Sequence, residues 1–230
     1  MHIPDGFINA GTSLAAGVAA VGGVGASLKK AADTMEEKQA PLAGLVAAFV
    51  FAVQMLNFPV ALGTSGHLLG GVLATVLVGP WAGVICVALV LLVQALFFAD
   101  GGLSALGLNV LNMAIVGGLG GYAAFVVVRG ILKKTRPMVA LASAIAAGIS
   151  VVMASFAFFV EYALGGVGDA SLRAVFVAMI GVHVLIGIGE AVITGLTVSA
   201  VLAVRPDLVY GAKGLMPDLE VRAVGSVSRR

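Results

Sequence analysis

Long apolar stretches separated by short polar or Gly/Pro-rich segments dominate the chain. A helix needs about 20 mainly apolar residues to cross the hydrocarbon core of a bilayer. Seven stretches have this apolar character and are expected to be helices: residues 12–28, 41–56, 68–78, 81–98, 110–128, 138–163 and 172–204. The pattern predicts an all-α, polytopic membrane protein with seven transmembrane helices, in which residues 1–205 form a single domain.

The third stretch, residues 68–78, is too short to cross a bilayer alone. It reaches a spanning length only if it begins within the polar segment Thr64-Ser65-Gly66-His67. That would place non-helical backbone below the membrane surface, where it is tolerated only if protein buries it or if it lines a cavity. This segment is therefore a candidate site.

The composition agrees with a lipid environment. Hydrophobic residues make up 60% of the chain and charged residues only 10%, whereas soluble proteins average about 25% charged residues. A soluble globule is therefore excluded. The 32 glycines fit close packing between membrane helices, and the single cysteine, Cys86, excludes a disulfide framework or a cysteine-rich metal site.

Lysine and arginine are retained on the cytoplasmic side of membrane proteins. An odd number of spans places 12 of the 13 basic residues on one side of the membrane and only Arg173 on the other. This distribution predicts an external N-terminus and a cytoplasmic C-terminus, with residues 206–230 as a flexible cytoplasmic tail. Residues 1–10 contain no lysine or arginine, so no cleaved signal is expected and Met1 should remain on the mature protein.

Two of the three histidines and the N-terminus are expected on the same face of the membrane. The amine of Met1, the amide nitrogen of His2 and the imidazole Nδ1 of His2 can close two adjacent chelate rings, which places three nitrogens in one plane. His67 can supply a fourth nitrogen. Square-planar coordination by four nitrogens is diagnostic of Cu(II) or Ni(II). The ordinary alternative for any single histidine is a hydrogen-bonded polar residue inside the bundle.

His183 and Glu190 are seven residues apart in the last apolar stretch, so both project from one helix face. An ionised carboxylate near the middle of a span costs about 2.5–3.5 kcal/mol and needs compensation. The pair either supports a metal site or ion passage, or forms an interhelical hydrogen bond. Asp100 and Glu161 are expected at external loop ends, where carboxylates usually mark the membrane interface.

Four side-chain amides have two possible uses, which the sequence leaves open. They either hydrogen-bond the irregular segment that carries His67 or pin helices together. They are Gln54, Asn57, Asn109 and Asn112.

Ordered motifs along nearly the whole chain resemble the CbiM/NikM family, the substrate-binding membrane components of energy-coupling-factor transporters for cobalt and nickel. The motifs are Met1-His2-Ile3-Pro4-Asp5-Gly6-Phe7, Asn57-Phe58-Pro59-Val60, Gly63-Thr64-Ser65-Gly66-His67-Leu68-Leu69-Gly70-Gly71, Gly79-Pro80-Trp81, Phe98-Ala99-Asp100-Gly101-Gly102-Leu103-Ser104-Ala105-Leu106-Gly107, Asn109-Val110-Leu111-Asn112-Met113, and His183 with Gly187-Ile188-Gly189-Glu190-Ala191. The C-terminal tail is not covered. Pro4-Asp5 replaces the Met-Glu of some members.

The resemblance implies that Met1, His2 and His67 bind Co²⁺ or Ni²⁺ as the transported substrate, with the N-terminus inserted into the bundle. Ser65, His183 and Glu190 are candidates for supporting these ligands. The implied partners are a transmembrane coupling subunit, two ATPase subunits and often a small accessory membrane protein. The implied location is the cytoplasmic membrane of a bacterium or archaeon.

Other functional classes remain as alternatives. The chain has no Gly-x-x-x-x-Gly-Lys-Ser/Thr loop and no His-Glu-x-x-His motif, so ATP hydrolysis is expected in partner subunits and no enzymatic activity is expected here. No nucleic-acid face is expected. The main alternative is a proton-coupled secondary transporter of divalent metals that uses Glu190 and His183 as its relay. An intramembrane metalloenzyme would need an open coordination position beside a general base.

Overall fold

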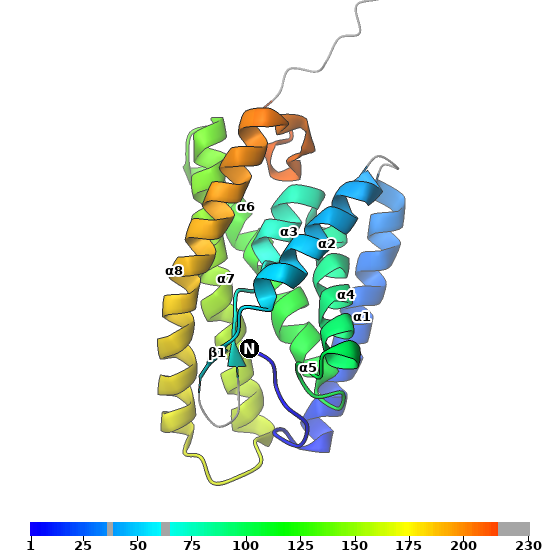
Figure 1. Cartoon of the computed structure of the whole chain (residues 1–230), viewed down its shortest axis with the longest axis vertical. Helices are drawn as coiled ribbons and strands as arrows, with labels where there is room; N and C mark the ends of the chain where they lie inside the picture. Colours follow the sequence, from blue (N-terminus) through cyan, green and yellow to red (C-terminus); the bar gives the residue numbers. More distant parts are fainter. Residues whose placement is uncertain (36–38, 61–64, 216–230) are drawn as a thin grey trace, which may run out of the picture.

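The computed structural model describes residues 1–35, 39–60 and 65–215 (Figure 1), and the side chains of residues 58, 59 and 65 lie outside this description. The elements are α1 (Ala10–Thr34), α2 (Ala40–Gln54), β1 (Phe58–Pro59), β2 (Ser65–Gly66), α3 (Gly71–Val78), α4 (Pro80–Phe97), α5 (Leu106–Val110), η2 (Leu111–Gly120), α6 (Gly121–Ile131), α7 (Arg136–Gly165), α8 (Leu172–Val204), η3 (Pro206–Leu208) and η4 (Tyr210–Ala212).

The predicted all-α class is confirmed, because the β structure in the described residues is limited to the two-residue antiparallel ladder of β1 and β2 and one isolated bridge. Within the described residues, five helices are long and apolar enough to cross a membrane: Ala10–Thr34, Pro80–Phe97, Leu106–Ile131, Arg136–Gly165 and Leu172–Val204. The third of these is continuous through α5, η2 and α6, with π-helical hydrogen bonding in η2. The chain is therefore a multi-pass helical membrane protein.

The two remaining predicted stretches form the shorter helices α2, of 15 residues, and α3, of 8 residues. Every residue of α3 is buried, because other helices surround it where lipid would surround an ordinary span. Gly71 allows one of these close contacts, since a Cβ there would lie 3.0 Å from the backbone nitrogen of Gly118. The burial of α3 in protein explains how so short an apolar helix is accommodated.

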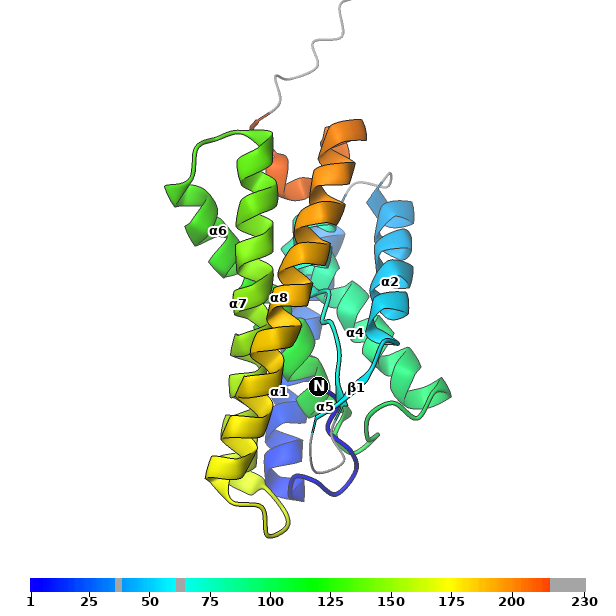
Figure 2. The ribbon, with the colours of Figure 1, turned by 60° about the vertical axis from the view of Figure 1, so that its left-hand side comes forward.

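The long helices α7 and α8 lie side by side in both views of the ribbon (Figures 1 and 2). Their backbones approach closely at Gly148 and Gly187, where a Cβ on Gly187 would lie 3.0 Å from the carbonyl oxygen of Gly148. Small residues permit such close helix packing in membranes. The buried residues of α8, which include His183 and Glu190, are thus positioned on a closely packed helix pair.

The N-terminal segment turns into the bundle before α1 begins (Figure 1). Met1 and Ile3 are buried, and Ile8 forms an isolated antiparallel bridge with Gly166. Asn9 then caps α1, its side-chain oxygen accepting the backbone N–H of Thr12 at 2.9 Å. The N-terminus is thus inserted into the bundle, in agreement with the resemblance.

The first ten residues of the predicted flexible tail are structured. Residues 206–212 form the two short turns η3 and η4, in which Val209, Gly211 and Ala212 are buried. The Tyr210 ring packs against Gly79, which has a positive φ of 94°. The sequence prediction missed this packing because small and apolar residues fit the end of α3 only once the bundle has formed. Residues 216–230 lie outside the described part.

Candidate metal site

The N-terminal segment is held by two neighbours of Ile3. The side-chain amide of Asn109 accepts the backbone N–H of Ile3 at 2.8 Å and donates to the Ile3 carbonyl at 3.3 Å. The same carbonyl accepts the backbone N–H of Gly102 at 2.8 Å. Because Ile3 follows His2 directly, these bonds fix the path of the backbone at the potential ligands.

The loop between α4 and α5 lies against this segment. Asp5 Oδ1 accepts the backbone N–H of Ser104 at 2.8 Å and its hydroxyl at 2.6 Å. Gly101 has a positive φ of 91°, and a Cβ there would lie 3.2 Å from His2 Cδ2. Glycine is therefore required at this position for both backbone conformation and space.

His2 and His67 are in direct contact. Their rings stack with centroids 4.5 Å apart and an interplanar angle of 26°, and both residues are buried. Nε2 of His2 and Nε2 of His67 have no hydrogen-bond partner, whereas Nδ1 of His2 lies 2.9 Å from Asp100 Oδ1. Buried polar atoms are normally paired, so unpaired imidazole nitrogens beside the N-terminus are the feature that points to a metal.

The tautomer of His67 is set by its own loop. Nδ1 lies 2.7 Å from the carbonyl oxygen of Leu68, which can only accept a hydrogen bond, so Nδ1 carries the proton and Nε2 presents a lone pair. His183 is arranged in the same way, with Nδ1 2.7 Å from the carbonyl of Met179 and Nε2 unpaired. Such backbone contacts orient metal-binding histidines in many proteins.

Glu190 ties the loop that carries His67 to α8. Its Oε2 accepts the backbone N–H of Leu69 at 2.9 Å, and its Oε1 accepts that of Gly70 at 2.7 Å. From α2, Gln54 Nε2 donates to the Leu69 carbonyl at 2.6 Å. The backbone that follows His67 is thus anchored on two helices.

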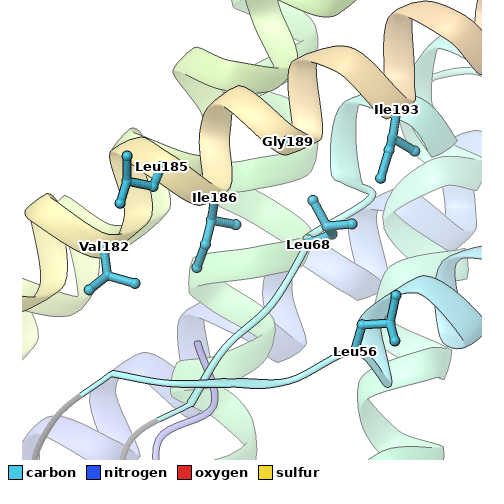
Figure 3. A pocket seen from close by; sticks show the side chains of 7 residues that line it. All are labelled: Leu56, Leu68, Val182, Leu185, Ile186, Gly189 and Ile193. Atoms are coloured by element: carbon cyan, nitrogen blue, oxygen red, sulfur yellow. The ribbon is translucent and has the colours of Figure 1, made fainter.

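Leu68 marks the opposite side of this loop. Figure 3 shows its side chain pointing into an apolar groove beside α8, together with Leu56 and Ile186. The groove contains no ionisable side chain, so it offers nothing to bind a cation. The polar groups of the candidate site lie on the opposite side of the loop, with His67.

Burial keeps the candidate nitrogens neutral. It lowers the pKa of the Met1 amine to about 4, although Asp100 acts in the opposite sense. Burial also lowers the pKa of His2, again against the effect of Asp100. The pKa of His67 is held well below its ordinary value, first by burial and then by the Met1 amine, His2 and His183. Neutral nitrogens have the free lone pairs that a metal requires.

Side chains alone do not complete a site in the described part of the chain. No three His, Cys, Asp or Glu residues there are grouped so as to hold a metal ion. The lone pairs of imidazoles lie in the ring planes, so the stacked His2 and His67 reach one ion only after one ring turns. A metal bound between these two rings would therefore need further donors, for which the Met1 amine and the His2 amide are the candidates.

The structure brings Met1, His2 and His67 together and sets Glu190 against the loop that carries His67. His183 lies close to Gly66, where a Cβ would be 3.8 Å from its Cε1. The side chain of Ser65 is outside the described part, so its supporting role stays a prediction.

Two of the four amides follow the predicted uses, and Asn57 instead donates to Asp100 Oδ2 at 3.1 Å. Gln54 binds the His67 loop, whereas Asn112 links two helices by donating to Glu161 Oε2 at 2.6 Å. Asn109 binds the N-terminal segment, which the sequence did not suggest. Glu161 itself is buried and is therefore not the solvated interface residue that was expected.

Sequence reasoning also missed two residues near His2. Asp100 Oδ1 lies 2.9 Å from His2 Nδ1, whereas an interface role had been expected. Gln94 is completely buried, with both side-chain polar atoms unpaired. The sequence offered one signal for Asp100, the run Asp100-Gly101-Gly102. Two glycines after a carboxylate suggest a loop with a specific backbone conformation.

The family model described as the cobalt uptake substrate-specific transmembrane region, CbiM, matches residues 2–208. The chain belongs to the CbiM family. The family has relatives named for nickel as well: a provisionally named fused nickel transport protein NikMN of Archaeoglobus fulgidus is 38% identical over 209 residues, covering 91% of this chain and 68% of that protein.

Two further comparisons agree. The cobalt transport protein CbiM of Sorangium cellulosum is 36% identical over 174 residues, covering 73% of this chain and 75% of that protein. A crystal structure of a truncated transition metal transporter is 33% identical, with a TM-score of 0.82, and covers 88% of this chain and 99% of that one. These relatives are transport proteins, which agrees with the expectation that this CbiM-family chain is not an enzyme.

Proposed function

We propose that this chain is the substrate-binding component of an ATP-driven energy-coupling-factor transporter and captures Co²⁺ or Ni²⁺ for uptake. The proposed donors are the Met1 amine, the amide nitrogen and Nδ1 of His2, and Nε2 of His67. Four nitrogens in one plane suit Ni²⁺ in particular. The metal is the substrate and is handed on after capture.

The contact between His2 and His67 carries this proposal. Two buried imidazoles with unpaired nitrogens stack at 4.5 Å beside a buried amine. A purely structural histidine pair would gain by hydrogen-bonding these atoms. The names of the relatives, which mention cobalt, nickel and metal transport, support the same class of substrate.

The proposed topology has seven crossings, with the N-terminus external and the C-terminus cytoplasmic, in a bacterial or archaeal cytoplasmic membrane. The distribution of basic residues supports it. The proposed partners are a transmembrane coupling subunit, two ATPase subunits and a small accessory membrane protein. The absence of a P-loop motif from the sequence supports the assignment of ATP hydrolysis to another chain.

Release requires His67 to separate from the Met1-His2 chelate. The two bonds from Glu190 give a physical route, because movement of α8 relative to α3 would carry Leu69 and Gly70 and with them the neighbouring His67. Ultraviolet and visible absorption of bound metal in the resting and ATP-driven complexes tests this step. Identical spectra in the two states would count against separation of the ligands.

The same bonds weigh against a proton relay through Glu190 and His183. Both Glu190 oxygens are engaged by backbone donors, which favours a holding role. A relay predicts metal uptake by this chain alone that collapses when the proton gradient is removed. Capture without transport by the isolated chain favours the proposed function.

The central experiment is isothermal titration of purified protein with Ni²⁺ and Co²⁺. One sample has Met1 as its first residue, a second carries one additional residue before Met1, and a matched control carries one additional residue at the C-terminus. The proposal requires tight binding by the first and third samples and loss of binding by the second. Equal binding by all three would remove the amine, and with it the chelate, from the site.

A further inference from the structure

Glu161 and Asn112 form a buried polar contact between α7 and η2. Asn112 Nδ2 donates to Glu161 Oε2 at 2.6 Å. Asn112 is completely buried and Glu161 is 7% exposed. Neither residue belongs to the proposed metal site, so this contact needs an explanation of its own.

The second oxygen of each of these two side chains lacks a donor. Glu161 Oε1 and Asn112 Oδ1 are both buried without a hydrogen-bond partner. If Glu161 is ionised, both oxygens can only accept, and neither can satisfy the other. Burying an ionised carboxylate that accepts a single hydrogen bond is costly, and such a group takes up a proton instead.

A proton on Glu161 satisfies both oxygens at once. A protonated carboxyl group has one O–H donor and one carbonyl acceptor, which complement the N–H donor and carbonyl acceptor of an amide. The Nδ2–Oε2 bond already joins the two planar groups, and the unpaired oxygens are the second atoms of the same groups. An Oε1–H that donates to Asn112 Oδ1 therefore closes a ring of two hydrogen bonds and leaves no buried charge.

Among the described residues, no charged group acts on the carboxyl of Glu161 to favour its ionised form. η2 and α3 carry no titratable side chain. Those of α1, α6 and η4 lie toward the opposite end of the bundle from the loop between α7 and α8 (Figure 1). The titratable side chains of the nearer segments make other contacts or are exposed: Asp5, Tyr162, Asp169, Arg173, His183 and Glu190.

Phe7 covers the face of α7 that carries Glu161. Phe158, Glu161 and Tyr162 share this face, because they are three and four residues apart, and all three are buried. The ring of Phe7 lies 5.8 Å from that of Phe158 and 5.3 Å from that of Tyr162. The Phe7 carbonyl accepts the backbone N–H of Val167 at 3.0 Å. The N-terminal segment is thus fixed over the turn of α7 that contains Glu161.

We propose that Glu161 is a proton-binding site. It carries a proton at neutral pH and forms a cyclic acid–amide pair with Asn112 that joins α7 to η2, and Phe7 keeps water from this pair. Loss of the proton breaks one of the two bonds and places a charge between the helices. The segment covers Glu161 with or without bound metal, so the pair adds nothing to proton release on metal binding. The inference does not depend on which ion is transported.

Infrared spectroscopy of the full chain tests the proposal, because the C=O stretch of a protonated carboxyl group is resolved from the bands of carboxylates and amides. Glu161→Gln removes the acid and keeps an NH₂ group that can donate to Asn112 Oδ1, so this variant should fold. Glu190→Gln is the matched control. Glu190 is also buried, but both its oxygens accept backbone N–H groups, as suits an ionised carboxylate.

Wild type and Glu190→Gln should show the acid band at neutral pH, and Glu161→Gln should lack it. Folded wild-type protein without the band, or a folded Glu161→Gln variant that retains it in full, would overturn the proposal. If Glu161→Gln does not fold, Asn112→Ala decides the question. The band of Glu161 must shift when its amide partner is removed, and an unshifted band would refute the pairing.

The role of Phe7 has its own test in the same measurement. Phe7→Ala should make the acid band exchange faster in heavy water and should cause its loss as the pH is raised, because water then reaches Glu161. Leu164→Ala is the control, since Leu164 lies on the same helix and is 74% exposed. Equal exchange rates in wild type and Phe7→Ala would refute the covering role.

Discussion

Glu190 Oε1 accepts the backbone N–H of Gly70 at 2.7 Å, across 120 positions of the sequence. Gly70 has a positive φ of 70° and directly precedes α3. This bond and its neighbour at Leu69 join α8 to the start of the most buried helix. A carboxylate within an apolar helix thus has a definite use, which is to hold the loop that presents His67.

Replacing Glu190 with Gln should weaken Ni²⁺ or Co²⁺ binding by about 10- to 100-fold, the usual effect of losing a group that orients a ligand. The NH2 group of the glutamine side chain cannot accept a hydrogen bond. One of the two backbone N–H groups would therefore lose its acceptor. Capture should survive in weakened form. Titration calorimetry measures the change, and Glu161→Gln is the control because Glu161 contacts Asn112 instead. Equal losses in the two variants would show a general loss of stability.

Replacing Asn109 with Ala should release the N-terminal segment. The N–H of Ile3 would lose its partner, and an unsatisfied buried donor costs about 1–3 kcal/mol. This corresponds to a roughly 5- to 150-fold loss in metal affinity. Hydrogen exchange of residues 1–9 should accelerate in parallel. The control is Asn112→Ala on the next helical turn, and unchanged exchange in Asn109→Ala would refute the anchoring role.

Replacing Gly102 with Ala should abolish metal binding. A Cβ at this position would clash with the backbone of Asp5, and backbone atoms can yield only if the whole segment moves. The matched control is Gly22→Ala in α1, where a Cβ would meet nothing within 4 Å. Thermal unfolding in detergent and metal titration should be run together. Full affinity in Gly102→Ala would mean that the segment has another way to reach His67.

Proton release on metal binding should be close to one proton per ion near pH 7. The lowered pKa values of the Met1 amine, His2 and His67 mean that these donors are already neutral at this pH and release nothing. Only the His2 amide must lose a proton. The logarithm of the binding constant should therefore fall by about one for each pH unit from pH 8 to 5.

A short Met-His peptide provides the comparison for this slope. Its exposed amine has a pKa of about 7.7–8.0 and its imidazole one of about 6.5, so its affinity should fall more steeply below pH 8. Calorimetry in buffers of different ionisation enthalpy counts the protons in each case. Binding by the protein that does not vary between pH 8 and 5 would rule out amide ligation.

The sequence by itself determined the helical membrane character of the chain and the adjacency of the Met1 amine to the nitrogens of His2. Both are local properties: the length and polarity of a stretch decide whether it can cross a bilayer, and adjacent chelating groups share a backbone. The same reasoning identified the short stretch 68–78 as exceptional, since eleven residues cannot cross alone.

Only the tertiary structure decided which polar groups meet. Asn109 pairs with Ile3 across 106 positions, and Glu190 pairs with Leu69 across 121. The placement of Asp100 beside His2 likewise depends on a loop whose glycine backbone is shaped by its neighbours. Residues 206–212 are structured for the same reason, because their apolar groups find a complementary surface only at the completed end of α3. The choice of partner for a buried polar group depends on the packing of distant segments, and no local pattern encodes it.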